Sequence, residues 1–393
     1  MPVKMLVVDD EPDLESLIRQ KFRKQIRDKE YEFLFAQNGV EALVKIADHP
    51  DVSVVLSDIN MPEMDGLTLL MKLDEFKNPA LKSVIVSAYG DMENIRTAMN
   101  RGAFDFVTKP IDFNDLEVTI NKTIAQLEVI KRAVEEHEQL VSVRSDLTVA
   151  TKIQQSILPN TFPAFPHRAE FDIFAQMVTA KEVGGDFYDF FFLDQDRLAV
   201  IVGDVSGKGV PAAIFMAVSR TLLKSIAMQI GNPGEALRRV NTLLIPESNM
   251  AMFVTIFYGI LNTRTGELQY TNGGHNPPYV MRNDGSVEPL APTEGMLLGM
   301  LEDMEYDVKK ISLQPGEKLF MYTDGVTEAM NFNRDLFGEP NLITCLQAGK
   351  DMPLRDLVRC VYESIEKFET GFPHADDITM LALQFIGKNR QPS

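Results

Sequence analysis

Residues 52–66 read VSVVLSDINMPEMDG, a short apolar run that ends at Asp58 and continues into a loop with proline and glycine. Apolar runs of this length are typical of strands buried on both faces of a parallel sheet. Similar runs occur at three further places: Met5–Val8, Ser83–Ser87 and Phe104–Val107. Two segments between the runs have helical spacing of apolar residues: Asp13–Phe22 and Val40–Ala47. Alternating strands and helices predict a doubly wound α/β sheet for residues 1–120.

The whole chain has 393 residues, which predicts two or three domains. Its 57 acidic against 39 basic residues give a net charge of -18, which argues against nucleic acid and anionic membranes as partners. The two cysteines, Cys345 and Cys360, form no C-x-x-C pair and suit a reducing compartment. Met1–Asp10 has neither the pattern of a signal peptide nor that of an anchor, and no apolar stretch approaches the eighteen or so residues of a spanning helix. We expect a soluble, cytoplasmic protein.

From Phe113 to Leu158 the sequence has neither proline nor glycine, which predicts one long helix, with residues 121–158 as a linker. An apolar stripe near heptad spacing predicts a coiled coil, and therefore a homodimer through this helix. Polar residues at His137, Arg144 and Thr148 interrupt the stripe, so the pairing would be adjustable. The alternative is a single helix packed on one domain. The stripe consists of Leu116, Ile120, Leu127, Ile130, Val134, Val141 and Leu147.

Pro159, Pro163 and Pro166 end this helix, and a second domain is predicted at residues 159–388. Grouped strands interrupted by helices indicate antiparallel sheet with helices packed outside. The predicted strands are Phe171–Met177, Phe187–Leu193, Leu198–Val202, Met252–Leu261, Leu268–Thr271, Leu319–Tyr322 and Ile378–Phe385. The predicted helices are Val210–Met228, Pro233–Ile245 and Leu354–Phe368.

Polar residues follow the strands of the first domain at the edge where ligands of open parallel sheets bind. They are Asp9, Asp10, Asp58, Ser87 and Lys109. Three carboxylates that converge repel one another unless a cation lies among them, and oxygen ligands favour Mg²⁺ over Zn²⁺. With Mg²⁺ and the Lys109 ammonium on the phosphate oxygens, Asp58 can attack a phosphoryl group and carry it as an aspartyl phosphate.

The segment Asp58–Gly66, together with these residues and Pro110, closely resembles the receiver domain of two-component response regulators. The resemblance covers nearly all of residues 1–120 and implies a flavodoxin-like fold. It implies that a sensor histidine kinase phosphorylates Asp58, that Ser87 and Phe106 form a switch pair, and that Lys109 contacts the phosphate before a cis Pro110. A core aromatic stays an alternative role for Phe106. The Mg²⁺ ligands implied are Asp9, Asp10, Asp58 and the carbonyl of Asn60.

Acidic residues in the second domain lie beside strands or glycine turns, where glycine lets a ligand approach the backbone closely. The motifs are Gly184–Asp186, Gly203–Gly209, Thr323–Gly325 and Ala375–Thr379. The five histidines show no H-x-x-x-H arrangement, so oxygen ligands for Mg²⁺ or Mn²⁺ are predicted in place of a zinc site. Two such ions about 3.5 to 4 Å apart can activate water and polarise a phosphate oxygen, which suits phosphoester hydrolysis.

These motifs resemble the PPM-type metal-dependent serine/threonine phosphatases, particularly their stage II sporulation protein E branch. The resemblance covers about residues 150–386, with Ile153–Pro159 and Gly273–Pro277 among its motifs, and implies an α/β sandwich of two antiparallel sheets between helical layers. It implies two Mn²⁺ or Mg²⁺ ions bridged by Asp204 and the Val205 carbonyl. The other ligands implied are Asp186, Asp324 and Asp376, with Asp377 as the alternative to Asp376. Asp189 is expected in an outer shell, and His275 in a structural or substrate-groove role.

Two other motif interpretations fit less well. Gly203–Gly209 contains a Gly-Lys pair, but a phosphate-binding loop needs four residues between its glycines and Ser or Thr after the lysine. Gly184–Phe187 is similar to the diguanylate cyclase signature, except that Phe187 and Tyr188 replace its Glu-Phe ending.

The sequence therefore predicts a response regulator in which phosphorylation of Asp58 controls a protein serine/threonine phosphatase. The resemblance implies a phosphorylated anti-sigma-factor antagonist as substrate, within stress or sigma-factor signalling. The alternative is a non-catalytic adaptor that binds a sigma factor or its regulator for proteolysis. Such an adaptor does not need its metal acids, and all of them are present here, which favours catalysis. The sequence leaves open whether phosphorylation activates or inhibits.

Overall fold

The computed structural model describes residues 2–88, 90–247, 252–372 and 374–387, and the chain forms two compact units, Met1–Val143 and Arg144–Ser393. Residue 388, the expected end of the second domain, lies outside the described residues.

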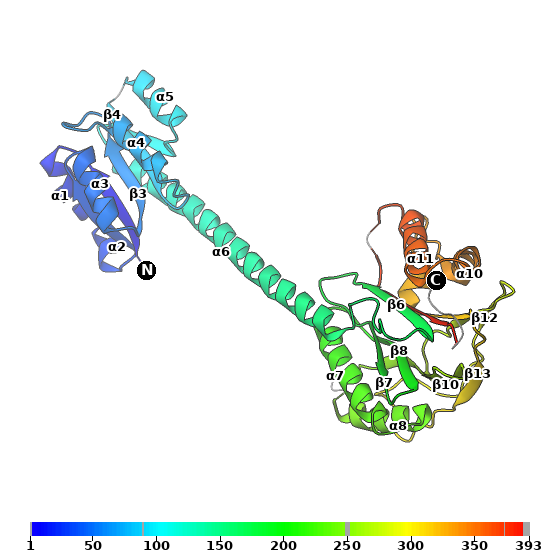
Figure 1. Ribbon diagram of the computed structural model, residues 1–393. Coiled ribbons are helices and arrows are strands. Elements are labelled where there is room, and N and C mark those ends of the chain that lie inside the picture. Colours follow the sequence, from blue (N-terminus) through cyan, green and yellow to red (C-terminus); the bar gives the residue numbers. More distant parts are fainter. Residues whose placement is uncertain (1, 89, 248–251, 373, 388–393) are drawn as a thin grey trace. The chain divides into compact units, whose positions relative to one another are not determined.

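The first unit contains a five-stranded parallel sheet in the order β2-β1-β3-β4-β5. Its strands are β1 (Val3–Val8), β2 (Tyr31–Ala36), β3 (Val52–Asp58), β4 (Lys82–Ala88) and β5 (Asp105–Lys109). Its helices are α1 (Pro12–Lys21), α2 (Arg23–Arg27), α3 (Gly39–Asp48), α4 (Gly66–Glu75) and α5 (Met92–Asn100), which surround the sheet (Figure 1). The predicted doubly wound fold is confirmed.

Both faces of this sheet are buried, as the continuous apolar runs predict. Met5 and Val7 of β1 belong to one core cluster, whereas Leu6 and Val8 belong to the cluster on the opposite face. Strand β2 was not among the predicted runs. It lies at an edge of the sheet and keeps Tyr31 and Glu32 partly exposed, so its sequence is less apolar than that of the central strands.

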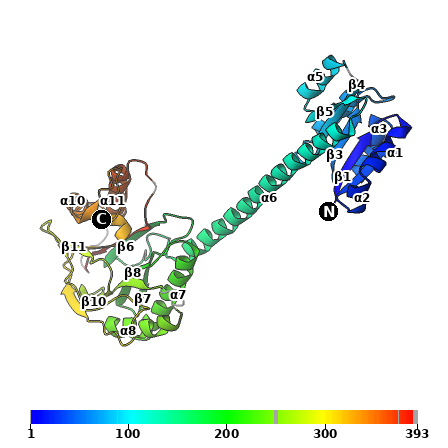
Figure 2. The same ribbon diagram turned by 180° about the vertical axis from the view of Figure 1, so that it is seen from behind.

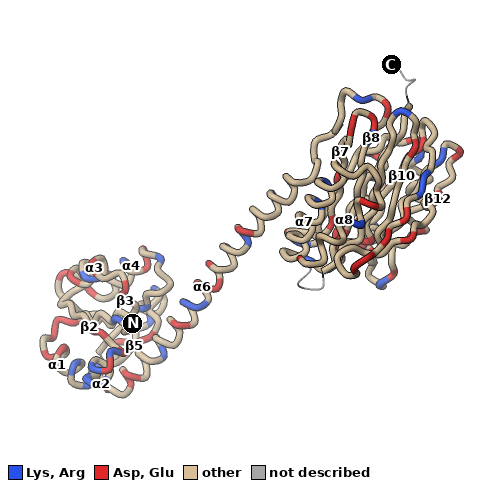
Figure 3. Tube along the Cα trace, turned by 90° about the horizontal axis from the view of Figure 1, so that it is seen from below, with Lys and Arg blue, Asp and Glu red and all other residues tan. Residues whose placement is uncertain are grey.

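Helix α6 (Phe113–Ile157) is one uninterrupted helix of 45 residues, as predicted. However, Leu116, Ile120 and Leu127 are at most 3% exposed and pack in the core of the first unit. These three residues cannot also form a seam with another helix, so that part of the coiled-coil prediction is wrong. Val134 and Val141, further along the stripe, are exposed. Charged residues of both signs occur along the helix (Figure 3).

The second unit contains two five-stranded antiparallel sheets, with the strand orders β13-β10-β9-β8-β7 and β12-β11-β14-β15-β6. The longer strands are β6 (Phe171–Val178), β7 (Phe187–Phe192), β8 (Arg197–Val205), β9 (Val254–Asn262), β10 (Glu267–Gly273), β14 (Lys318–Tyr322) and β15 (Ile378–Phe385). The shorter ones are β11 (Tyr279–Met281), β12 (Val287–Pro289) and β13 (Lys309–Ser312). The sequence analysis missed these three because strands of three or four residues show no periodicity.

Helices cover the outer face of each sheet (Figures 1 and 2). Helices α7 (Val210–Ala227) and α8 (Pro233–Leu244) pack on the sheet that contains β8, and α10 (Gly338–Ala348) and α11 (Leu354–Glu369) pack on the other. Strand β15 shows the layering: Leu381 and Leu383 point into the core between the sheets, whereas Met380 and Ala382 point towards α11. The predicted sandwich is confirmed. Short helices at α9 (Asp324–Thr327) and Ile245–Glu247 complete the unit.

Helix α7 is, among the described residues, the one helix long and apolar enough to cross a membrane. The expectation that no stretch approaches this length was therefore wrong. The helix packs Phe215, Met216 and Leu223 in the core, and its Arg220 forms an ion pair with the buried Asp189. Helices in the core of globular domains make such contacts, and they can be as long and as apolar as a membrane-spanning helix.

Candidate functional site

The carboxyl ends of β1 and β3 bring three acids of the first unit together. The ligand oxygens of Asp9, Asp10 and Asp58 all lie within 4.8 Å of one another, which among the described residues is the one acidic trio this tight. Asp9 and Asp58 are buried, whereas Asp10 is exposed. The donor set is entirely oxygen and carries three negative charges, which fits Mg²⁺. The Asn60 backbone N–H lies 3.4 Å from Asp58 Oδ1, so the loop after β3 folds back over the same carboxylate.

Lys109 at the end of β5 supplies the positive charge of this site. Its ammonium lies 2.7 Å from Asp58 Oδ2, 3.0 Å from Asp9 Oδ2 and 2.9 Å from Glu11 Oε1. Burial lowers the pKa of Lys109, but the hydrogen bonds to Asp58, Glu11 and Asp9 outweigh burial and raise the pKa overall. Burial raises the pKa of Asp9. The sequence analysis did not select Glu11, although it directly follows the Asp9–Asp10 pair.

The other predicted residues of the first unit lie next to the cluster of Asp9, Asp10 and Asp58 or at the surface. Ser87 is buried at the end of β4, with its hydroxyl 3.5 Å from Asp91 Oδ2. Phe106 is 36% exposed, so the core-aromatic alternative is wrong. The Lys109–Pro110 peptide bond is cis, as expected.

Four acids from different elements of the second unit act on one another electrostatically. They are Asp186 before β7, Asp204 in β8, Asp324 at the start of α9 and Asp376 before β15. Burial and the neighbouring charge of Asp204 raise the pKa of Asp186 well above its usual range. Burial and the charge of Asp324 raise the pKa of Asp204 to about 7. Mutual repulsion on this scale is what divalent cations relieve, and the all-oxygen donor set fits Mg²⁺ or Mn²⁺.

The backbone around these acids is packed closely enough to need glycine. A Cβ atom at Gly185 would lie 2.8 Å from the Val205 carbonyl oxygen, the other predicted ligand of β8. Asp186 Oδ2 accepts a hydrogen bond of 2.6 Å from the Thr323 hydroxyl, which in turn accepts one from the Thr379 backbone N–H. Thr323 thus ties Asp186 to β14 and β15. The sequence analysis did not identify Thr323, although it directly precedes Asp324.

The contacts of Asp377 and Asp376 distinguish their roles. Asp377 accepts hydrogen bonds of 2.8 Å from the backbone N–H groups of Ala180 and Gly185, one on each carboxylate oxygen. The charges of both residues act on Asp204, but only Asp376 also acts on Asp324, and its Oδ2 lies 2.8 Å from the ammonium of Lys208. Asp377 is thus occupied in holding the Gly184–Asp186 loop, and Asp376 is the acid that faces a cation. This geometry favours Asp376 as the ligand.

Gln154 of α6 holds the same loop from the other side. Its buried side-chain amide donates a 2.6 Å hydrogen bond to the Gly184 carbonyl oxygen and accepts one of 3.1 Å from the Gly184 N–H. From the sequence, Gln154 was expected only as part of the Ile153–Pro159 motif.

Gln154→Ala is expected to raise the Mn²⁺ concentration needed for half-maximal hydrolysis of p-nitrophenyl phosphate by about 10- to 100-fold, because positioning residues behind metal ligands have effects of this size. The measurement is a Mn²⁺ titration of the wild type and the variant. Gln155→Ala, the same change at the exposed neighbour, is the control. Equal titration curves for wild type and Gln154→Ala would contradict the positioning role.

His275 is buried, and its two side-chain contacts fix the tautomer of the ring. Its Nδ1 lies 2.8 Å from the Thr255 hydroxyl and its Nε2 lies 3.1 Å from the Tyr322 carbonyl oxygen, so Nε2 carries the proton and Nδ1 accepts. Burial lowers the pKa of His275 to about 4. These contacts join β9 to β14, in keeping with the expected structural role.

A pKa below that of the unfolded chain means that His275 stabilises the fold fully above about pH 6.5 and progressively less as the pH falls towards 4. We expect the protonation cost to reduce the free energy of unfolding by about 2 kcal/mol at pH 5. Urea unfolding at pH 7.5 and pH 5 in the presence of EDTA measures this loss. In His275→Gln the pH-dependent loss should shrink by that amount, and an unchanged loss would contradict the assignment.

Asp189 lies outside the acidic site. It is fully buried in β7 and forms ion pairs with Arg220 at 2.7 Å and Lys224 at 3.6 Å, both on α7. Its partners are therefore cations of α7, and the structure gives no support for the outer-shell expectation.

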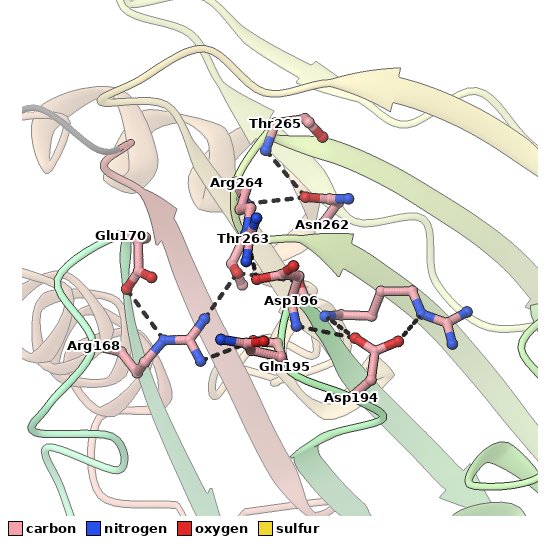
Figure 4. Close-up of polar contacts among 10 residues, drawn as sticks. Arg168, Glu170, Asp194, Gln195, Asp196, Asn262, Thr263, Arg264 and Thr265 are labelled. Atoms are coloured by element: carbon pink, nitrogen blue, oxygen red, sulfur yellow. Dashed lines mark hydrogen bonds and ion pairs between the residues drawn. The ribbon is translucent and has the colours of Figure 1, made fainter.

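A separate polar network at the turn after β7 and the turn after β9 links Arg168 and Arg264 to acids and backbone oxygens (Figure 4). None of the predicted site residues belongs to it.

Comparisons with known proteins give one matching family model in each of the two units. The family model "Response regulator receiver domain" matches residues 5–121, and "Stage II sporulation protein E (SpoIIE)" matches residues 194–386. Protein IcfG of Synechocystis sp. is 33% identical over 267 residues, 61% of this chain and 41% of that protein. Phosphoserine phosphatase RsbU of Bacillus subtilis is 28% identical over 257 residues, 64% of this chain and 75% of that protein.

Among solved structures, the SiaA-PP2C domain of Pseudomonas aeruginosa matches with a TM-score of 0.56 and 22% identity, over 63% of this chain and 98% of that domain. A likeness at this identity bears on the fold alone. The chain spans less than half the length of IcfG and three quarters of RsbU. Residues 5–121 therefore belong to the response regulator receiver domain family, and residues 194–386 belong to the stage II sporulation protein E family.

Proposed function

We propose that this protein is a response regulator in which phosphorylation of Asp58 controls a metal-dependent protein serine/threonine phosphatase. The observation that carries the proposal is the joint placement of Asp186, Asp204, Asp324 and Asp376, whose pKa values or charges are coupled within one site. An adaptor would have no need to keep four mutually repelling acids together.

In the receiver domain, an oxygen of the Asp58 carboxylate attacks the phosphorus of the phosphodonor, and the donor group departs with the electrons of the broken bond. Mg²⁺, when bound by Asp9, Asp10, Asp58 and the Asn60 carbonyl, supplies charge that stabilises the phosphoryl oxygens. Lys109 already lies 2.7 Å from the accepting carboxylate and neutralises part of its charge. The proposed phosphodonor is a sensor histidine kinase.

In the phosphatase domain, two Mn²⁺ or Mg²⁺ ions, when bound, supply the charge that activates water and stabilises the phosphoryl oxygens. Asp204, the Val205 carbonyl, Asp186, Asp324 and Asp376 would hold these ions. Thr323 orients Asp186 through its 2.6 Å hydrogen bond, and Asp377 fixes the loop that carries it. Water attacks the phosphorus, and the serine or threonine oxygen leaves and takes up a proton.

Control would reach this site through α6, because the Gln154 amide binds the Gly184 backbone two residues before Asp186. The exposed Val134 and Val141 would pair with a second copy of the helix and make the protein a homodimer. A phosphoserine protein is the proposed substrate, because the similar RsbU is named a phosphoserine phosphatase, and the family resemblance of the motifs implies an anti-sigma-factor antagonist in particular. Free Cys345 and Cys360 suit the cytoplasm as location.

The test is Mn²⁺-dependent hydrolysis of p-nitrophenyl phosphate and of a phosphoserine peptide, with and without acetyl phosphate. We expect hydrolysis that requires Mn²⁺ and changes in rate when acetyl phosphate loads Asp58. Failure to hydrolyse either substrate at any Mn²⁺ concentration would favour the adaptor, and capture of a sigma-factor regulator by the same protein would then be the next measurement.

A further inference from the structure

Strand β6 forms the edge of its sheet, with β15 as its one strand neighbour. A groove of about 660 Å³ lies between this edge and the end of α6, and its lining includes Phe174–Val178 of β6, Gln154 of α6 and Arg355 of α11. Edge strands present unpaired backbone groups, and folded proteins usually cover them. The question is which part of the β6 edge is covered and which part is open.

The register of the sheet determines which backbone groups of β6 face away from β15. The Thr323 N–H donates to the Thr379 carbonyl oxygen, so the backbone groups of Thr379 point towards β14 and those of its neighbour Met380 point towards β6. Met380 pairs with Gln176, and Ala382 pairs with Phe174. Gln176 and Phe174 are therefore bonded to β15, and the residues between and after them, Ala175 and Met177, direct their N–H and C=O groups to the open side.

At the beginning of the edge, a neighbouring side chain binds one of the outward N–H groups. Ile173, which by the same alternation also directs its N–H to the open side, donates it to Asp172 Oδ1 at 2.9 Å. No comparable contact from another part of the described chain reaches the backbone of Ala175 or Met177. Ala175 and Met177, whose outward backbone groups have no hydrogen-bond partner among the described residues, both line the groove, and Met177 is the more accessible of the two because Ala175 is only 4% exposed.

The open end of β6 leads to the acidic site. The Ala180 N–H, three residues beyond Met177, donates to Asp377 Oδ1, and the other oxygen of Asp377 holds Gly185 next to Asp186. At about 3.3 Å per strand residue, a strand beside Ala175 and Met177 would come within about 10 Å of these acids.

The charge of the groove favours a negatively charged occupant. Arg355 lies over the Phe174 ring, with its guanidinium carbon 5.3 Å from the ring centroid. Within the described residues it forms no ion pair, although the chain carries a net charge of -18. An unpaired guanidinium beside an open strand edge complements an acidic or phosphorylated extended segment.

We propose that this groove binds an extended segment of the phosphoprotein substrate as an additional strand beside β6, and that the strand directs the phosphorylated side chain to the acidic site. The inference rests on the proposed phosphatase function and specifies how its substrate is held. Added strands gain affinity mainly from main-chain hydrogen bonds, so the recognition would tolerate many sequences and would require an unfolded or extended phosphorylated segment.

The test uses synthetic phosphoserine peptides extended by one to eight alanine and threonine residues on either flank, with Mn²⁺ and the full-length protein. We expect kcat/KM to rise at least tenfold with length on one flank only, and N-methylation of alternate residues on that flank to remove the gain. Glutamate in that flank should raise kcat/KM further in the wild type and in Arg355→Lys, but not in Arg355→Glu.

Equal kcat/KM for all lengths, with p-nitrophenyl phosphate still hydrolysed, would overturn the groove proposal and leave the phosphatase function standing. Absence of hydrolysis of every peptide and of p-nitrophenyl phosphate would overturn both. If β6 pairs with a second copy of the chain instead, the peptides should show no length effect and Met177→Pro should lower the molar mass measured by light scattering.

Discussion

Asp204→Asn is expected to lower Mn²⁺-dependent hydrolysis of p-nitrophenyl phosphate by about a thousandfold or more. Asp204 is the acid whose carboxylate is coupled to Asp186, Asp324 and Asp376 together, so its loss would disturb both cation positions. Charge stabilisation by bound cations contributes several kcal/mol to such reactions, and about 4 kcal/mol corresponds to a thousandfold change in rate. The measurement is kcat/KM at saturating Mn²⁺, together with direct Mn²⁺ binding.

The matched control is Asp194→Asn. Asp194 makes its ion pair with Arg197 in the turn between β7 and β8, in the polar network away from the predicted site residues (Figure 4). This variant should keep its activity within a factor of two. Asp204→Asn that binds Mn²⁺ and hydrolyses substrate like the wild type would remove Asp204 from the mechanism. Circular dichroism of both variants separates loss of activity from loss of fold.

Asp58→Asn is expected to abolish phosphorylation by acetyl phosphate completely. The amide of asparagine lacks the anionic oxygen that attacks phosphorus, and it also lacks the charge that now binds the Lys109 ammonium at 2.7 Å. Phosphorylation is measured as the shift of intact protein mass by one phosphoryl group. In this variant, acetyl phosphate should also leave the rate of p-nitrophenyl phosphate hydrolysis unchanged.

Asp74→Asn on the exposed side of α4 serves as the control and should be phosphorylated like the wild type. If the Asp58→Asn variant still gains the mass of a phosphoryl group, another residue must be the acceptor. Normal phosphorylation of the wild type without any change in hydrolysis would separate the two domains functionally, whatever the role of Asp58.

Much of the acidic chemistry could be predicted from the sequence, because strand ends and glycine turns place carboxylates predictably. Asp58 follows a continuous apolar run, so its position at a sheet edge follows from the strand itself. Gln154 and Thr323 were not identified, because their partners Gly184 and Asp186 are distant in the sequence. Hydrogen bonds between such distant segments leave no local pattern.

Neighbouring residues of the same type were also beyond sequence reasoning. Asp376 and Asp377 have identical chemistry, and only the two backbone N–H groups bound by Asp377 distinguish them. The apolar stripe of α6 shows the same limit: spacing cannot tell whether Leu127 faces its own domain or a second helix. In both cases the partner, not the residue, decides the role.

The double hydrogen bond between Gln154 and Gly184 has a consequence for how such proteins are assembled. Under the proposed control, the second domain would respond to the position of one side chain on the last turns of a helix, and that contact contains nothing specific to a receiver domain. Any input domain that moves or rotates this helix would act on the contact between Gln154 and Gly184 in the same way. Interchangeable sensors could thus be grafted upstream of an unchanged catalytic domain, provided that the helical phase at Gln154 is kept.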